Sequence, residues 1–179
     1  MDWTDIVISG YVLSENKEKI SKSKDNAPTD PEKLLTQFAP DAIRFWTACG
    51  TLGQDTAFSI EQITIGQKLM NKMWNAFKFI DLNSKQFASL PHNSEHMDLI
   101  NQWIMQQSLQ ALYDYRVAFE KNEFSGALSV IEKLFWHDFC DNYLEIIKDK
   151  FFNPTKYDQA DIAATIFALR SVGFHILQM

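Results

Sequence analysis

Apolar residues recur at helical spacing in four long stretches between Ser59 and the end of the chain, and this pattern limits the fold more than any other feature. Ser59 with Gln62 three residues later is typical of a helix N-terminus and predicts a helix over 60–82. The other helices are expected over 95–121, over 124–152 up to a break at Asn153-Pro154, and from 159 onward. Four long amphipathic helices joined by short linkers predict an antiparallel bundle.

The first 58 residues have a different pattern. β-branched and aromatic residues at 6–8 and 11–13, separated by Gly10, predict a short strand or β-hairpin. A polar loop is expected over 21–30, followed by a helix with Asp30 as N-cap and a second helix from Pro40 to Gly50. The sequence therefore predicts a mainly α protein, in which a hairpin and loop region (1–58) precedes a helical bundle (59–179).

Composition excludes several classes of protein. With 46% hydrophobic residues the chain has enough apolar surface to form a core, and its net charge of −6 argues against a generic, charge-driven nucleic-acid binder. The two cysteines, Cys49 and Cys140, lie in apolar helical patterns and are expected to be buried thiols. No uninterrupted apolar run of about 18 residues and no signal peptide are recognisable, so a soluble, intracellular protein without membrane contact is expected.

The segment Lys19-Ile20-Ser21-Lys22-Ser23-Lys24 concentrates ammonium and hydroxyl donors directly after the predicted strand. Taken alone, it has two interpretations. It is either an exposed, solvated charge cluster or a clamp for phosphate, because ammonium groups and hydroxyls both donate to phosphate oxygens.

The surrounding sequence favours the clamp. Together with Ile8-Ser9-Gly10-Tyr11-Val12-Leu13 before it and Asp41-Ala42-Ile43-Arg44-Phe45-Trp46 after it, the segment resembles the class I aminoacyl-tRNA synthetases, where this loop is the "KMSKS" signature. The resemblance implies that Lys22 and Lys19 are catalytic and that Lys22, Ser21 and Ser23 contact the ATP phosphates. It also implies ATP with Mg²⁺ in the parent enzyme, with neither expected to be bound to this chain. Ile20 replaces the usual Met and Asp25 the usual Gly, and neither change removes a phosphate donor.

Further segments resemble the valyl branch of this family, namely Gly50-Thr51-Leu52-Gly53-Gln54-Asp55, Asn71-Lys72-Met73-Trp74-Asn75-Ala76 and the stretch 135–145. The resemblance implies a cytoplasmic, monomeric valine–tRNA ligase that uses valine, ATP and tRNA(Val). Residues 1–58 would end its catalytic domain, and 59–179 would be a C-terminally truncated anticodon-binding bundle. The second class I signature, with two His, is absent, so the chain alone is expected not to aminoacylate. An isoleucyl or leucyl enzyme and a non-catalytic helical protein-interaction module remain alternatives.

The helix expected from residue 60 has a polar arc when its residues are placed about 100° apart. This arc holds the candidate tRNA-binding residues Lys68, Asn71, Lys72, Asn75, Lys78 and Phe79. They form either a solvated helix face, with Phe79 covered by a neighbouring element, or an RNA surface with an aromatic for base stacking. Trp74, Trp103 and Trp136 are expected in the core, and the four His suggest no structural metal.

Overall fold

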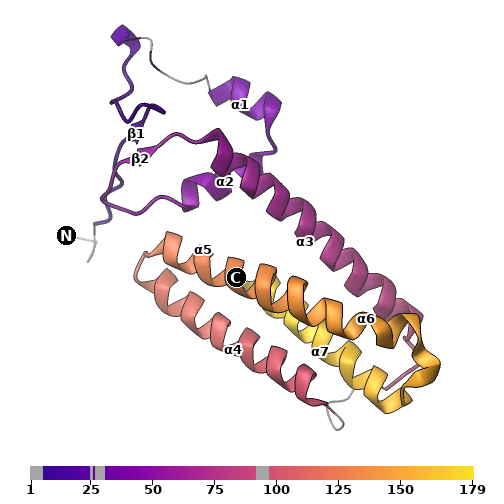
Figure 1. The fold of residues 1–179 in the computed structure, drawn as a ribbon. Helices are drawn as coiled ribbons and strands as arrows, with labels where there is room; N and C mark the ends of the chain where they lie inside the picture. Colours follow the sequence, from indigo (N-terminus) through magenta and orange to yellow (C-terminus); the bar gives the residue numbers. More distant parts are fainter. Residues whose placement is uncertain (1–5, 25, 27–30, 92–96) are drawn as a thin grey trace. The chain divides into compact units, whose positions relative to one another are not determined.

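The protein is mainly helical in the computed structural model, which describes residues 6–24, 26, 31–91 and 97–179 (Figure 1). Its contacts divide the chain into two compact units. The first comprises residues 1–73 with 118–128, and the second comprises 74–117 with 129–179. The boundary expected between residues 58 and 59 stays a prediction.

The core of the first unit lies where two short helices, α1 (Pro31–Gln37) and α2 (Pro40–Ala48), pack with the start of α3 (Ile60–Gln86). The Trp46 and Phe58 rings meet edge to face with their centroids 5.3 Å apart. The amide of Gln62 donates to the Ser59 hydroxyl at 3.2 Å, which confirms the predicted start of α3. Asp30, the predicted cap of α1, lies outside the described residues.

The predicted hairpin is only partly formed. Strand β1 (Val12–Leu13) has a single antiparallel bridge, from Leu13 to Lys19, and its main partner is the parallel strand β2 (Thr56–Ala57). A Cβ atom at Gly10 would lie 2.0 Å from the Gln54 carbonyl oxygen, so only glycine allows this close approach. The parallel pairing differs from expectation because a partner more than 40 residues away leaves no local sequence signal.

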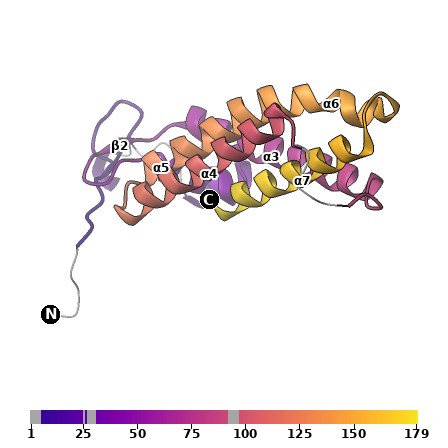
Figure 2. The same cartoon turned by 90° about the horizontal axis from the view of Figure 1, so that it is seen from below.

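In the second unit, α4 (Leu99–Glu120), α6 (Glu145–Phe152) and α7 (Gln159–Gln178) lie side by side (Figures 1 and 2). The helix expected over 124–152 consists of α5 (Phe124–Glu132), the π-helical η2 (Lys133–Leu144) and α6. It ends at Phe152, with Asn153 as its C-cap before the short η3 (Pro154–Lys156), which confirms the predicted break. Residues 95–96, where α4 was expected to begin, lie outside the described part.

Helix α7 forms much of the core of this unit. Its length and apolar composition would also allow a membrane span, but 56% of the window that passes this test is buried inside the protein. Among its buried residues are Ile166, Leu169 and Val172, and its buried Thr165 takes part in side-chain hydrogen bonds. This burial is that of a core helix packed against its neighbours.

A buried polar network, which was not predicted from the sequence, joins α4, η2, α6 and α7. The Lys150 ammonium, on a side chain only 8% exposed, donates to Asp98 at 2.7 Å, Asp161 at 2.7 Å and Thr165 at 3.1 Å. The Asn101 amide donates to Thr165 at 2.9 Å and accepts from the Tyr143 hydroxyl at 2.7 Å. Burial raises the pKa of Tyr143 well above its usual value, and the negative charge of Asp98 adds to the shift.

Candidate functional site

The segment from Lys19 to Lys24, called the lysine-serine loop below, follows a tight turn that is held by hydrogen bonds between Ser14 and Glu18. The Ser14 amide donates to the Glu18 carbonyl at 2.8 Å, and the buried Ser14 hydroxyl accepts from the Glu18 amide at 3.2 Å. Lys17 has a φ of 60°, in the left-handed region that such a turn requires. The bridge from Leu13 to Lys19 then fixes where the loop leaves the strand.

Asn26 holds the loop from the other side. Its side-chain oxygen accepts from the Ser21 amide at 2.9 Å, and its side-chain NH₂ donates to the Lys19 carbonyl at 3.1 Å. One side-chain amide thus satisfies a backbone donor and a backbone acceptor on the two sides of Ile20, as a neighbouring strand would. No role of Asn26 could be predicted from the sequence, because this contact depends on the folding of the loop.

The predicted phosphate donors lie around the one-turn helix η1 (Lys22–Lys24). The Lys19 ammonium is 4.4 Å from the centre of the Tyr11 ring, a cation–π distance. The Ser21 and Ser23 hydroxyls are 3.3 Å apart, and Lys24 pairs with Glu18 at 3.4 Å on the surface. The side chain of Lys22 lies outside the described part of the structure.

These groups suit a polyphosphate chemically. Ser21 and Ser23 offer neighbouring hydroxyls and Lys19 adds an ammonium group. The preceding turn carries the Glu15 and Glu18 carboxylates, and Lys24 partly neutralises Glu18. A metal ion has no ready-made site, because no three His, Cys, Asp or Glu side chains gather suitably among the described residues.

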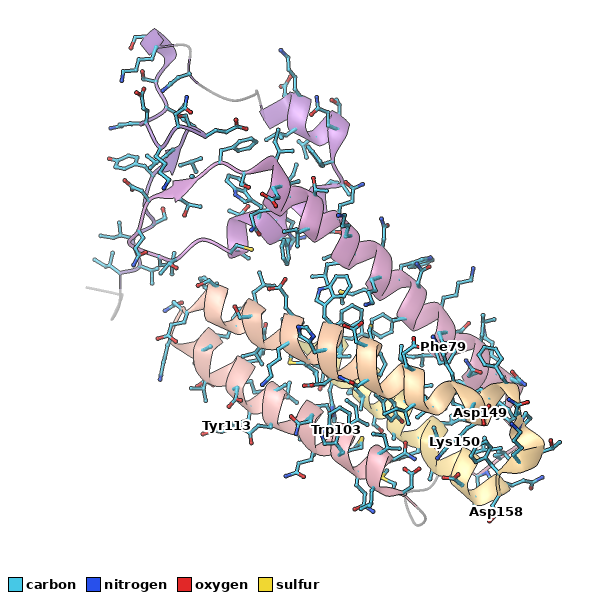
Figure 3. All side chains as sticks on the ribbon, viewed as in Figure 1. Phe79, Trp103, Tyr113, Asp149, Lys150 and Asp158 are labelled. Atoms are coloured by element: carbon cyan, nitrogen blue, oxygen red, sulfur yellow. The ribbon has the colours of Figure 1, made fainter. Side chains whose placement is uncertain are left out.

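The candidate RNA residues on α3 differ in exposure. Lys68, Asn71, Asn75 and Lys78 are exposed, whereas Lys72 and Phe79 are half-buried. The Phe79 ring meets Phe151 of α6 edge to face with the centroids 5.8 Å apart, and Figure 3 shows Phe79 on the side of α3 toward α6. A neighbouring element therefore covers part of Phe79, and its stacking on a base stays a prediction.

Trp74 is the main correction to the predicted site. It was expected in the core, but 75% of the residue is exposed, so that expectation is wrong. Trp103 and Trp136 are half-buried, and the Trp136 ring lies 6.1 Å from that of Phe135. The helical period could have predicted this exposure, because Trp74 precedes Lys78 by four residues and so lies on the same polar face of α3.

Comparison with protein families gives two matches. Residues 2–59 match the model "tRNA synthetases class I (I, L, M and V)", and residues 101–179 match the model "Anticodon-binding domain of tRNA ligase". The first match includes the lysine-serine loop and both strands, and the second runs from Asn101 in α4 through α7.

Curated relatives and a solved structure agree with these matches. The chain is 39% identical over 164 residues to the valine–tRNA ligase of Ehrlichia canis, covering 90% of this chain and 20% of the relative. It is 32% identical over 186 residues to that of Rickettsia felis, covering 100% and 21%. Its fold is similar to that of LeuRS in the LeuRS–tRNA–LeuAMS complex of Agrobacterium radiobacter, with a TM-score of 0.63, 19% identity, and 94% and 21% coverage. The chain thus spans about a fifth of these proteins.

Proposed function

Because the chain belongs to the class I tRNA synthetases of the isoleucine, leucine, methionine and valine group, we propose that it is a segment of a valine–tRNA ligase. Such an enzyme activates valine with ATP and esterifies it to tRNA(Val). The assignment to valine is supported chiefly by the similarity to valine–tRNA ligases over 90–100% of the chain. The family also favours a cytoplasmic location, and a monomer remains our expectation.

The lysine-serine loop would hold the ATP phosphates. In this proposal Lys22 meets the negative charge that develops as pyrophosphate leaves, while Lys19, Ser21 and Ser23 donate to neighbouring phosphate oxygens. The contribution is electrostatic, because these groups stabilise charge without removing a proton from the substrate. The chain holds the loop but lacks the paired-His signature, so on its own it would bind tRNA without aminoacylating it.

Lys22→Ala in the complete ligase tests the role of the loop. By analogy with the loss of one preorganised oxyanion donor, pyrophosphate exchange should fall by roughly 10²- to 10³-fold. Lys17→Ala is the matched control, because Lys17 lies in the preceding turn and should leave the rate unchanged. A rate within a few-fold of wild type for Lys22→Ala would refute the phosphate role.

The helical part would bind the anticodon region of tRNA(Val), and the exposed face of α3 supplies lysine and asparagine side chains for this contact. The test is to titrate the chain with a tRNA(Val) transcript and with a transcript changed only in the anticodon. Salt-sensitive binding that is lost with the anticodon supports the proposal. Preference for an isoleucine or leucine tRNA would instead favour those enzymes, and binding indifferent to the anticodon would favour a protein-interaction module.

A further inference from the structure

The most exposed tryptophan of the described chain is placed where a nucleotide could reach it. Trp74 is 75% exposed on α3, and Asn75 and Lys78 beside it are exposed as well. Residues four apart lie on the same helix face with Cβ atoms about 5–6 Å apart, so Lys78 follows Trp74 one turn along α3. The Trp74 and Lys78 side chains therefore project from neighbouring positions on one exposed face of α3.

The local charge of α3 favours an anionic partner. The helix carries four lysines, at 68, 72, 78 and 85, against the two acidic residues Glu61 and Asp81, although the whole chain has a net charge of −6. Asp81 is itself paired with Lys85 at 2.7 Å. Of the four lysines, Lys78 lies nearest to Trp74 on the helix surface, and its positive charge complements a phosphate group.

We propose that Trp74 and Lys78 form a subsite for one unpaired nucleotide of an RNA loop. The indole stacks on the base, and the Lys78 ammonium contacts a neighbouring phosphate. The inference rests on the proposed RNA-binding function and assigns the stacking role to Trp74, because the Phe79 ring already meets Phe151. A base held inside a duplex would not offer its face to Trp74, so the ligand is a loop and not a helix of RNA.

An open groove lies further along α3, between this helix and α7. The groove has a volume of about 580 Å³, and its lining includes Lys85, Arg170 and Phe174, a residue that is 60% exposed. The lining also includes Asp81, which pairs with Lys85, so Arg170 and Phe174 are the groove side chains that suit a nucleotide flanking the stacked base.

The experiment measures binding of a tRNA(Val) transcript by fluorescence anisotropy at several salt concentrations. Trp74→Ala should weaken binding by roughly 5- to 150-fold, the range known for base–aromatic stacking, whereas Trp74→Phe should retain most of the affinity. Leu82→Ala is the matched control, because Leu82 is also an exposed apolar residue of α3, at 57% exposure, and should change the affinity less than twofold.

Salt dependence separates the two parts of the subsite. Lys78→Ala should reduce the slope of log K against log salt by about 0.7–0.9, the value for one phosphate contact. Trp74→Ala should lower the affinity at every salt concentration and leave this slope unchanged, because stacking releases no counterions.

Three results would overturn the inference. If wild type binds with anticodon dependence but Trp74→Ala stays within twofold of it, the subsite is wrong and the proposed function stands. If Leu82→Ala loses as much affinity as Trp74→Ala, the face is a general apolar contact and not a stacking site. If wild type binds no RNA, the proposed function fails and the subsite fails with it. Circular dichroism of the variants checks that they fold.

Discussion

At the scale of single residues, Asn26 shows how one side chain can shape the candidate ATP loop. Its amide bonds to both the Ser21 amide and the Lys19 carbonyl, so it fixes the backbone from which the Ser21 and Lys19 side chains project. A hydrogen bond of this kind contributes roughly 0.5–1.5 kcal/mol net, and two of them are enough to set the preferred conformation of a short loop.

Asn26→Ala should therefore release the loop locally without unfolding the first unit. The expected result is a roughly tenfold faster hydrogen exchange of the Ser21 amide, measured by NMR, because local opening becomes about 1.4 kcal/mol easier. Asn16→Ala, at an exposed position in the preceding turn, should leave that exchange rate unchanged. Equal exchange in wild type and Asn26→Ala would mean that the two bonds do not hold the loop.

Predictability from sequence also differs from residue to residue. The loop could be located because Lys and Ser cluster within six residues, whereas the contribution of Asn26 depends on how the chain turns back on itself. The sequence could not show that Trp74 is more exposed than Phe79, because Phe151, which covers part of Phe79, is 72 residues further along the chain. Such long-range contacts leave no periodic trace.

At the scale of secondary-structure elements, the sequence predicted where helices begin and end better than it predicted which strands pair. Ser59 and Pro40 correctly marked the starts of α3 and α2, and Asn153-Pro154 marked the end of α6, because these residues act on neighbouring backbone groups. The parallel pairing of β1 with β2 and the π-helical form of η2 were missed. Both depend on tertiary packing, which local sequence patterns do not report.

The Lys150 network gives a prediction at this scale. Lys150→Met would remove the ammonium that Asp98 of the α4 N-terminus and Asp161 of α7 share, and it would leave both carboxylates partly buried without a cation. We expect the free energy of unfolding to fall by roughly 3 kcal/mol, measured by urea denaturation.

The control for this variant is close by in the same helix. Lys148→Met removes an exposed ion pair with Glu145 and should cost less than about 1 kcal/mol, because water screens the pair. If Lys150→Met were no more destabilising than Lys148→Met, the network would contribute little to the packing of α4, α6 and α7.

At the scale of the whole molecule, the fold class and the family-related regions were predictable, while the division into two compact units was not. Helical periodicity predicted a mainly α protein, and the loop residues supported the resemblance to class I synthetases that the comparisons then established. The division of α3 between the units could not be read from its sequence, since the helix pattern is continuous from Ile60 to Gln86.

Stability as a function of pH tests the packing of the second unit as a whole. His175 of α7 lies 2.9 Å from the Ser108 hydroxyl of α4 through its Nδ1 atom, and burial lowers the pKa of His175 below its ordinary value of 6.5. The unfolded chain then binds more protons than the folded chain at this site once the pH falls below about 6.5. This contribution to stability is complete above that pH and is lost as the pH falls through the folded-state pKa.

Wild type should consequently lose stability between pH 7.5 and pH 5.5, measured as the urea midpoint. His175→Asn, which can keep a hydrogen bond to Ser108 but does not titrate, should lose less over the same range. His137→Asn provides the control, because the His137 side chain is 74% exposed and its removal should leave the pH dependence as in wild type. Comparing the variants within this range isolates the histidine, since most carboxylates titrate below it. An identical loss in wild type and His175→Asn would show that the contact between α4 and α7 at Ser108 does not depend on a neutral imidazole.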